Sequence, residues 1–75
     1  MRLTPIKPEE MEKLLRHLGF RLVRQKGSHA VYEHPDGRST VLPMHRRELA
    51  KGTLRSILRD IGLSVEEYDR LRREI

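Results

Sequence analysis

The sequence contains no cysteine. Disulfides, thiolate nucleophiles and cysteine-based zinc sites are therefore excluded. The missing disulfides fit a cytoplasmic protein. No apolar run approaches the roughly 20 residues that a helix needs to cross a membrane, and residues 1–15 lack the apolar core of a signal peptide. We therefore expect a cytoplasmic protein with no membrane segment and no signal peptide.

Aromatic residues are also scarce, with one Phe, two Tyr and no Trp. RNA-recognition-motif sheets stack bases on aromatic side chains, so three aromatics argue against that kind of domain. The sequence shows no HExxH pattern, no pair of histidines at helical i, i+4 spacing and no GxxxxGK[ST] phosphate loop. We therefore expect no metal and no cofactor. A helix-turn-helix with a basic recognition helix is also missing, which counts against DNA as the ligand.

The chain of 75 residues is expected to form one domain, 1–75. Its net charge of +5 is concentrated in the middle, because residues 20–60 hold nine basic and four acidic residues whereas the rest holds seven of each. The nine basic residues are Arg21, Arg24, Lys26, Arg38, Arg46, Arg47, Lys51, Arg55 and Arg59. A positive charge gathered in one region predicts a polyanionic partner such as RNA or DNA.

Helical patterns occur near both ends of the chain. Residues 7–20 place Met11, Leu14, Leu15 and Leu18 on one helical stripe, after Pro8 in the first turn. Residues 53–62 repeat that spacing, with Gly62 as the stop signal, and follow a basic loop over 44–52. A further short helix starts after residue 64, where SVEE forms a capping box.

Three strands are predicted between these helices, over residues 20–26, 29–34 and 38–43. The connections are short, a glycine turn and the turn HPDG, so the strands should form an antiparallel meander. Three strands in so short a chain can bury only one face, and the helices should cover it. The sequence thus predicts an α+β domain of order α-β-β-β-α, plus a short C-terminal helix.

The segment RQKGSHAVYEHPDG, residues 24–37, contains the strongest candidate for chemistry. A turn containing Gly27 delivers His29 to the start of a strand, with Lys26 and Arg24 nearby and Ser28 offering a hydroxyl and an N–H. A histidine can exchange protons near neutral pH, and the cations can hold phosphate. From the residues alone, a single histidine after a glycine turn is more often structural, so a structural role for His29 stays open beside the catalytic one.

Strand alternation does not decide where His29 points. If Tyr32 packs under the helices, His29 looks out from the open face; if Val31 is inside, His29 lies at the rim of the sheet. We favour exposure.

The other histidines have simpler interpretations. His34, before Pro35, should make a local hydrogen bond or simply be exposed, and His17 should be exposed on the first helix. His45 could be a second acid/base group, a phosphate contact or an anchor of the basic loop.

The runs RQKGSHAVYEHPDGRSTVLPMH and ELAKGTLRSILRDIGLSVEEY closely resemble the HicA toxins of bacterial and archaeal toxin–antitoxin systems. The glycine-serine-histidine turn, the HPDG turn, VLPMH and GTLRSILRDIGLS occur in the family's order, and the likeness extends over nearly the whole chain. The resemblance implies a fold like that of double-stranded-RNA-binding domains. It also implies metal-independent endoribonuclease activity on mRNA, and neutralisation by a HicB-like antitoxin.

The family's essential histidine is the third residue of its G-S-H turn, which here is His29. We therefore expect His29 to be catalytic, with RNA contacts from Arg24, Lys26, Gly27, Ser28 and His45. Two alternatives stay open. One is a non-catalytic RNA-binding module of the same fold, and the other is a DNA-binding or protein-interaction domain.

Overall fold

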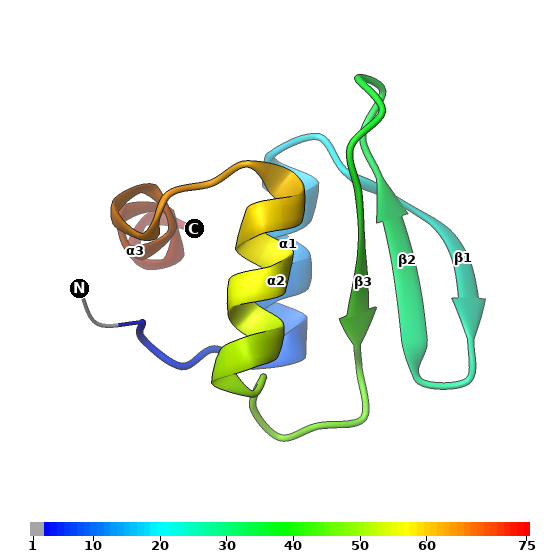
Figure 1. Cartoon of the computed structure of the whole chain (residues 1–75), viewed down its shortest axis with the longest axis horizontal. Coiled ribbons are helices and arrows are strands. Elements are labelled where there is room, and N and C mark those ends of the chain that lie inside the picture. The colour runs from blue at the N-terminus through cyan, green and yellow to red at the C-terminus, as the bar shows by residue number, and fades with distance from the viewer. Residues whose placement is uncertain (1–2) are drawn as a thin grey trace.

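The computed structural model describes residues 3–75 and contains one three-stranded sheet and three helices (Figure 1). In chain order the elements are α1 (Pro8–His17), β1 (Arg21–Lys26), β2 (His29–Glu33), β3 (Ser39–Pro43), α2 (Lys51–Ile61) and α3 (Val65–Glu74). The predicted α+β order is confirmed, including the additional C-terminal helix. Helix α2 begins two residues earlier than predicted, at Lys51, because Gly52 in its first turn does not prevent helix formation.

The sheet is an antiparallel meander of order β1-β2-β3, as predicted. One face is buried by the helices, and the side chains that point into it are Ala30 and Tyr32 from β2 and Thr40 and Leu42 from β3. Strand β3 lies nearest α1 and α2, whereas β1 is the strand farthest from the helices (Figure 1). All six residues of β1 are exposed, so this strand is a free edge.

The core forms where the apolar stripes of the helices meet the inner face of the sheet. Residues at i, i+3 and i+4 of α1 and α2 are buried, as their spacing predicts; they are Met11, Leu14 and Leu15 in α1 and Leu54, Ile57, Leu58 and Ile61 in α2. Helix α3 packs behind this layer through Tyr68, whose hydroxyl donates to the carbonyl of Thr4 at 2.5 Å. Its capping box is confirmed, since Ser64 and Glu67 exchange hydrogen bonds of 3.0 and 3.1 Å.

A β-bulge interrupts the pairing of β1 with β2. Leu22 pairs with Tyr32 and Arg24 pairs with Val31, so Val23 is an extra residue with no partner. Side chains two positions apart normally point to the same face of a sheet, but the extra residue places Leu22 and Arg24 on opposite faces. Phe20 and Leu22 can point to the helix side while Arg24 and Lys26 point to the open face. The sequence pattern did not predict this bulge.

The turn after β2 is held by its own side chains. The backbone N–H of His34 donates to the Arg38 carbonyl at 2.9 Å, and Gly37 has a positive φ of 101°. The Arg38 guanidinium contacts both carboxylate oxygens of Asp36, hydrogen-bonds the Ile61 carbonyl at the end of α2, and lies over the Phe20 ring. These contacts join the turn to the end of α2.

Candidate active site

The site is built around a two-residue turn between β1 and β2. Lys26 and His29 are direct cross-strand partners, so only Gly27 and Ser28 connect the strands. Gly27 has φ +59°, and no non-glycine residue among residues 3–75 has a positive φ. This pattern matches a type II′ hairpin turn with glycine first. Apart from Gly27 itself and its two chain neighbours, no atom of residues 3–75 lies within 4 Å of the position that a Cβ on Gly27 would occupy. The turn therefore places His29 opposite Lys26 and leaves the space outside Gly27 open.

His29 lies on the open face of the sheet, which the strand pattern left undecided, and it is exposed, as we favoured from the sequence. The decisive observation is the burial of its neighbours, because Ala30 and Tyr32 are only 2% and 1% exposed under the helices. Residues of a strand alternate between faces, so His29, Val31 and Glu33 point the opposite way. His29 is exposed, and a ligand on the open face can reach its imidazole.

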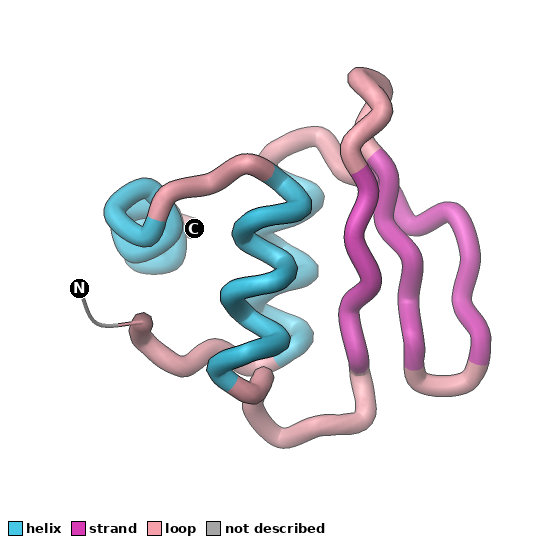
Figure 2. The backbone as a smooth tube through the Cα atoms, viewed as in Figure 1, coloured by secondary structure: helices cyan, strands magenta, loops and turns pink. Residues whose placement is uncertain are grey.

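The structure brings His45 beside His29, although they are sixteen positions apart in the sequence. The centroids of the two imidazole rings lie 5.9 Å apart, with 55° between the ring planes. His29 pairs with Pro43 across β2 and β3, and the N–H of Met44 donates to the Ser28 carbonyl at 2.6 Å. Figure 2 shows the β1–β2 turn and the loop that leaves β3 at the same end of the sheet. Two backbone connections thus bring His45 to the turn.

Arg24 lies on the same open face, two residues before Lys26 and paired with Val31. The six residues expected in the site therefore occupy one corner of the sheet; they are Arg24, Lys26, Gly27, Ser28, His29 and His45. Arg46 and Arg47 follow His45 and are exposed. This corner combines two imidazoles with cations that can hold a phosphate backbone.

Not every basic residue of the middle region is available to a ligand. Arg38 makes ion-pair contacts to Asp36 of 2.9 Å, at the opposite end of β2 from the Gly27 turn. Hydrogen bonds from Arg38, through its side chain and then its backbone, lower the pKa of Asp36 to about 2. Arg38 therefore stabilises its own turn.

The other two histidines have structural or surface positions. His34 accepts a hydrogen bond at Nδ1 from the Asp36 N–H at 3.1 Å, and its ring meets the Phe20 ring edge-on at 5.1 Å. Of the two roles expected for His34, the structure shows the local hydrogen bond, and the residue is half-buried. His17 is exposed on α1, also as predicted.

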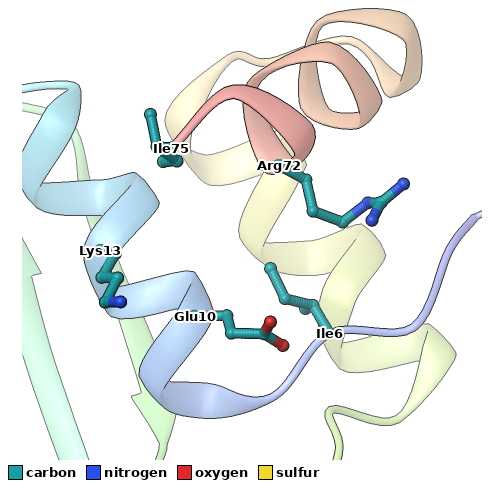
Figure 3. Close-up of a pocket in the computed structure, with 5 residues that line it drawn as sticks. All are labelled: Ile6, Glu10, Lys13, Arg72 and Ile75. Carbon is teal, nitrogen blue, oxygen red and sulfur yellow. The ribbon is translucent and has the colours of Figure 1, made fainter.

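Two surface hollows lie away from the sheet corner. One, of about 70 Å³, is lined by Ile6, Glu10, Lys13, Arg72 and Ile75, between α1 and the end of α3 (Figure 3). The other, of about 110 Å³, is lined by Leu3, Pro5, Glu48, Leu49, Lys51 and Leu54. Neither contains a histidine. Over residues 3–75, no three His, Asp or Glu side chains gather as a metal site would require, and no helix is long and apolar enough to cross a membrane.

Comparison with known proteins identifies the family. A search of curated proteins found no match to this chain. The family model described as the HicA toxin of bacterial toxin–antitoxin systems matches residues 8–63, which include α1, the whole sheet and α2. This range also contains every residue of the sheet corner described above. The chain therefore belongs to the HicA toxin family and is the toxin of a toxin–antitoxin system.

Proposed function

We propose that the protein is an endoribonuclease that cleaves mRNA without a metal ion and uses His29 as an acid/base catalyst. The observation that carries this proposal is the placement of His29, which is exposed on the open face directly across from Lys26. A catalytic group needs access to substrate and a fixed position, and the two-residue turn provides both. The family assignment supports a toxic activity of this kind.

The nucleophile in this proposal is the 2′-hydroxyl of the RNA. This hydroxyl lies next to the scissile phosphate, so the reaction needs no external nucleophile. His29 takes its proton or protonates the leaving 5′-oxygen. Lys26 and the backbone of Gly27 and Ser28 are placed to stabilise the charge that develops on the phosphate. The products are a 2′,3′-cyclic phosphate and a 5′-hydroxyl.

RNA binding in this proposal depends on the charge of the open face. Arg24 and Lys26 occupy one strand of that face, and His45 and the exposed arginines after it border the same corner. Phosphate contacts by Lys and Arg give affinity with little sequence preference. We place this activity in the cytoplasm, where mRNA is found.

A HicB-like antitoxin is the proposed protein partner. We expect it to be acidic where it binds and to cover the open face, so that His29 becomes inaccessible. Burial of a site by a protein partner requires about 1,200–2,000 Å² of total interface. The sheet corner provides charge complementarity for such a partner.

The test is incubation of end-labelled RNA with wild-type protein and with His29→Ala, both in EDTA. We expect the wild type to cleave and His29→Ala to lose at least ~10²-fold in rate. His17→Ala is a matched control, because that histidine is also exposed but lies on α1. Circular dichroism should show that all three chains fold.

The alternative is a non-catalytic RNA-binding module that uses the same basic corner. In that case the wild type and His29→Ala bind RNA equally and neither cuts it. Cleavage that stops in EDTA and returns with a divalent ion would instead contradict the metal-independent mechanism.

A further inference from the structure

The imidazole rings of His29 and His45 both lack polar partners within the part of the chain that the structure describes. Neither ring has a hydrogen-bond or ion-pair partner among residues 3–75, and both residues are exposed. His34 is different, since it is half-buried, accepts a backbone hydrogen bond and packs on Phe20. His34 thus makes the contacts expected of a histidine that stabilises the fold, and His29 and His45 do not make such polar contacts. The free ring nitrogens at the sheet corner are available to a ligand.

The proximity of the two rings is imposed by the backbone. His29 begins β2 and pairs with Pro43, whose ring fixes its φ angle. The next residue, Met44, donates its N–H to the Ser28 carbonyl, immediately before His29. The two residues before His45 are therefore held against His29 and Ser28. The geometry holds two proton-exchanging groups together, with Lys26 across from one of them.

We propose that His29 and His45 act as a two-histidine acid/base pair, an inference that rests on the proposed ribonuclease function. One imidazole removes the 2′-hydroxyl proton as the 2′-oxygen bonds to phosphorus. The other donates a proton to the 5′-oxygen as its bond to phosphorus breaks. The proton taken equals the proton given, and solvent restores both rings afterwards. His45 is then a catalytic residue as well as a contact to the RNA.

The distance between the rings suits this division of labour. A proton donor or acceptor must come within about 2.6–3.2 Å of the oxygen that it serves. Ring centroids 5.9 Å apart, with 55° between the ring planes, are close enough for the two imidazoles to serve different oxygens of one bound phosphodiester. A single imidazole cannot remove one proton and supply another in the same step. The second ring supplies that missing function.

A substrate with a sulfur atom in place of the scissile 5′-oxygen tests the pair. A thiolate leaves without protonation, so this RNA needs the base but not the acid. On ordinary RNA we expect His29→Ala and His45→Ala each to lose at least ~10²-fold, and His17→Ala to cut like the wild type. On the sulfur-containing RNA, one of the two slow variants should recover nearly the wild-type rate while the other stays slow. The variant that recovers identifies the acid.

A second variant separates catalysis from binding. His45→Gln keeps a hydrogen-bond donor for phosphate but cannot exchange a proton near neutral pH. We expect its RNA affinity to match the wild type and its cleavage of ordinary RNA to be as slow as that of His45→Ala. Melting temperatures should be unchanged, because His45 is an exposed loop residue.

Several results would overturn the pair while leaving the proposed function intact. These are wild-type cleavage by His45→Ala, restoration of cleavage by His45→Gln, or recovery of neither or both slow variants on the sulfur-containing RNA. Failure of the function itself looks different. In that case the wild type cuts no RNA, or His29→Ala cuts it at the wild-type rate.

Discussion

The hydroxyl of Tyr32 donates a hydrogen bond to the carboxylate of Glu12, joining the inner face of the sheet to α1. Glu12 also accepts from Arg16 at 3.2 Å, and the Arg16 guanidinium lies over the Tyr32 ring. The bond from Tyr32 is the main reason that the pKa of Glu12 is lowered. Burial, and then the bond to Glu12, raises the pKa of Tyr32 to about 12. This contact joins β2 to α1 at Tyr32, in the same strand that begins with His29.

We expect Tyr32→Phe to lower the free energy of unfolding by about 1.5–3 kcal/mol at neutral pH, because the lost bond has a charged acceptor. The folded-state pKa of Glu12 lies below its ordinary value of 4.5, so its stabilisation is present above that pH and is lost as pH falls. The difference between wild type and variant should therefore shrink in acid. Urea denaturation at about pH 7 and about pH 3 measures it.

Tyr68→Phe is the matched control, since Tyr68 donates to the uncharged carbonyl of Thr4. Its loss of stability should stay the same between those two pH values. An equally constant difference for Tyr32→Phe would show that the bond to Glu12 does not depend on the charge of the carboxylate.

Gly27→Ala tests the turn. A side chain at φ +59° is strained, which costs about 1–2 kcal/mol, although a Cβ there meets no atom within 4 Å. We expect this loss of stability together with slower RNA cleavage, because strain in the turn displaces His29. Gly52→Ala is the control, as its Cβ also meets nothing within 4 Å and its backbone is helical. That variant should be as stable as the wild type or more so, and should cut RNA normally.

RNA binding should weaken steeply with salt. Replacing Arg24 and Lys26 together by Gln should flatten the slope of log K against log salt by roughly 1–2, because up to two phosphate contacts are lost. Replacing Arg70 and Arg73 of α3 by Gln removes the same charge away from the sheet and should leave the slope unchanged. If only the α3 pair changes the slope, the RNA does not bind at the sheet corner.

The nucleophile can be tested with one 2′-deoxy sugar at the preferred cleavage site. That oligonucleotide should resist cleavage there, because its own nucleophile is missing. The same substitution one nucleotide away should leave the rate unchanged. Fragments that carry a 5′-phosphate would mean that water attacks instead of the 2′-hydroxyl.

Antitoxin binding should slow backbone hydrogen exchange in residues 24–32, which form most of the proposed contact surface. Residues 65–74 of α3 lie behind the helical layer and should exchange as in the free toxin (Figure 1). Protection of α3 without protection of 24–32 would place the partner elsewhere and make inhibition indirect.

Much of this fold follows from local sequence patterns. Helical spacing identified the buried residues of α1 and α2, such as Leu14 and Ile57, and the Ser64 capping box marked the start of α3. Short turns identified the antiparallel meander. These features depend on residues a few positions apart, which is the range over which periodicity carries information.

The site was predictable only in part. The turn and its histidine are visible as a motif, but the approach of His45 to His29 depends on the Pro43 pairing and the Met44–Ser28 bond. Such contacts between distant segments leave no periodic signal. The bulge at Val23 was equally unpredictable, because β-branched residues are common throughout strands and do not mark a bulge. The bond from Tyr32 to Glu12 joins residues twenty positions apart and had no signal either.

The free edge of β1 affects whether copies of this chain associate with one another. An uncovered strand offers its unpaired N–H and C=O groups to any extended chain, and aggregation commonly begins there. Three cations, Arg21, Arg24 and Lys26, line this edge, and the bulge at Val23 disturbs its regular spacing. Two identical edges would therefore repel and fit poorly, whereas a strand carrying carboxylates would not be repelled. The edge discourages self-association while it stays open to a partner of opposite charge.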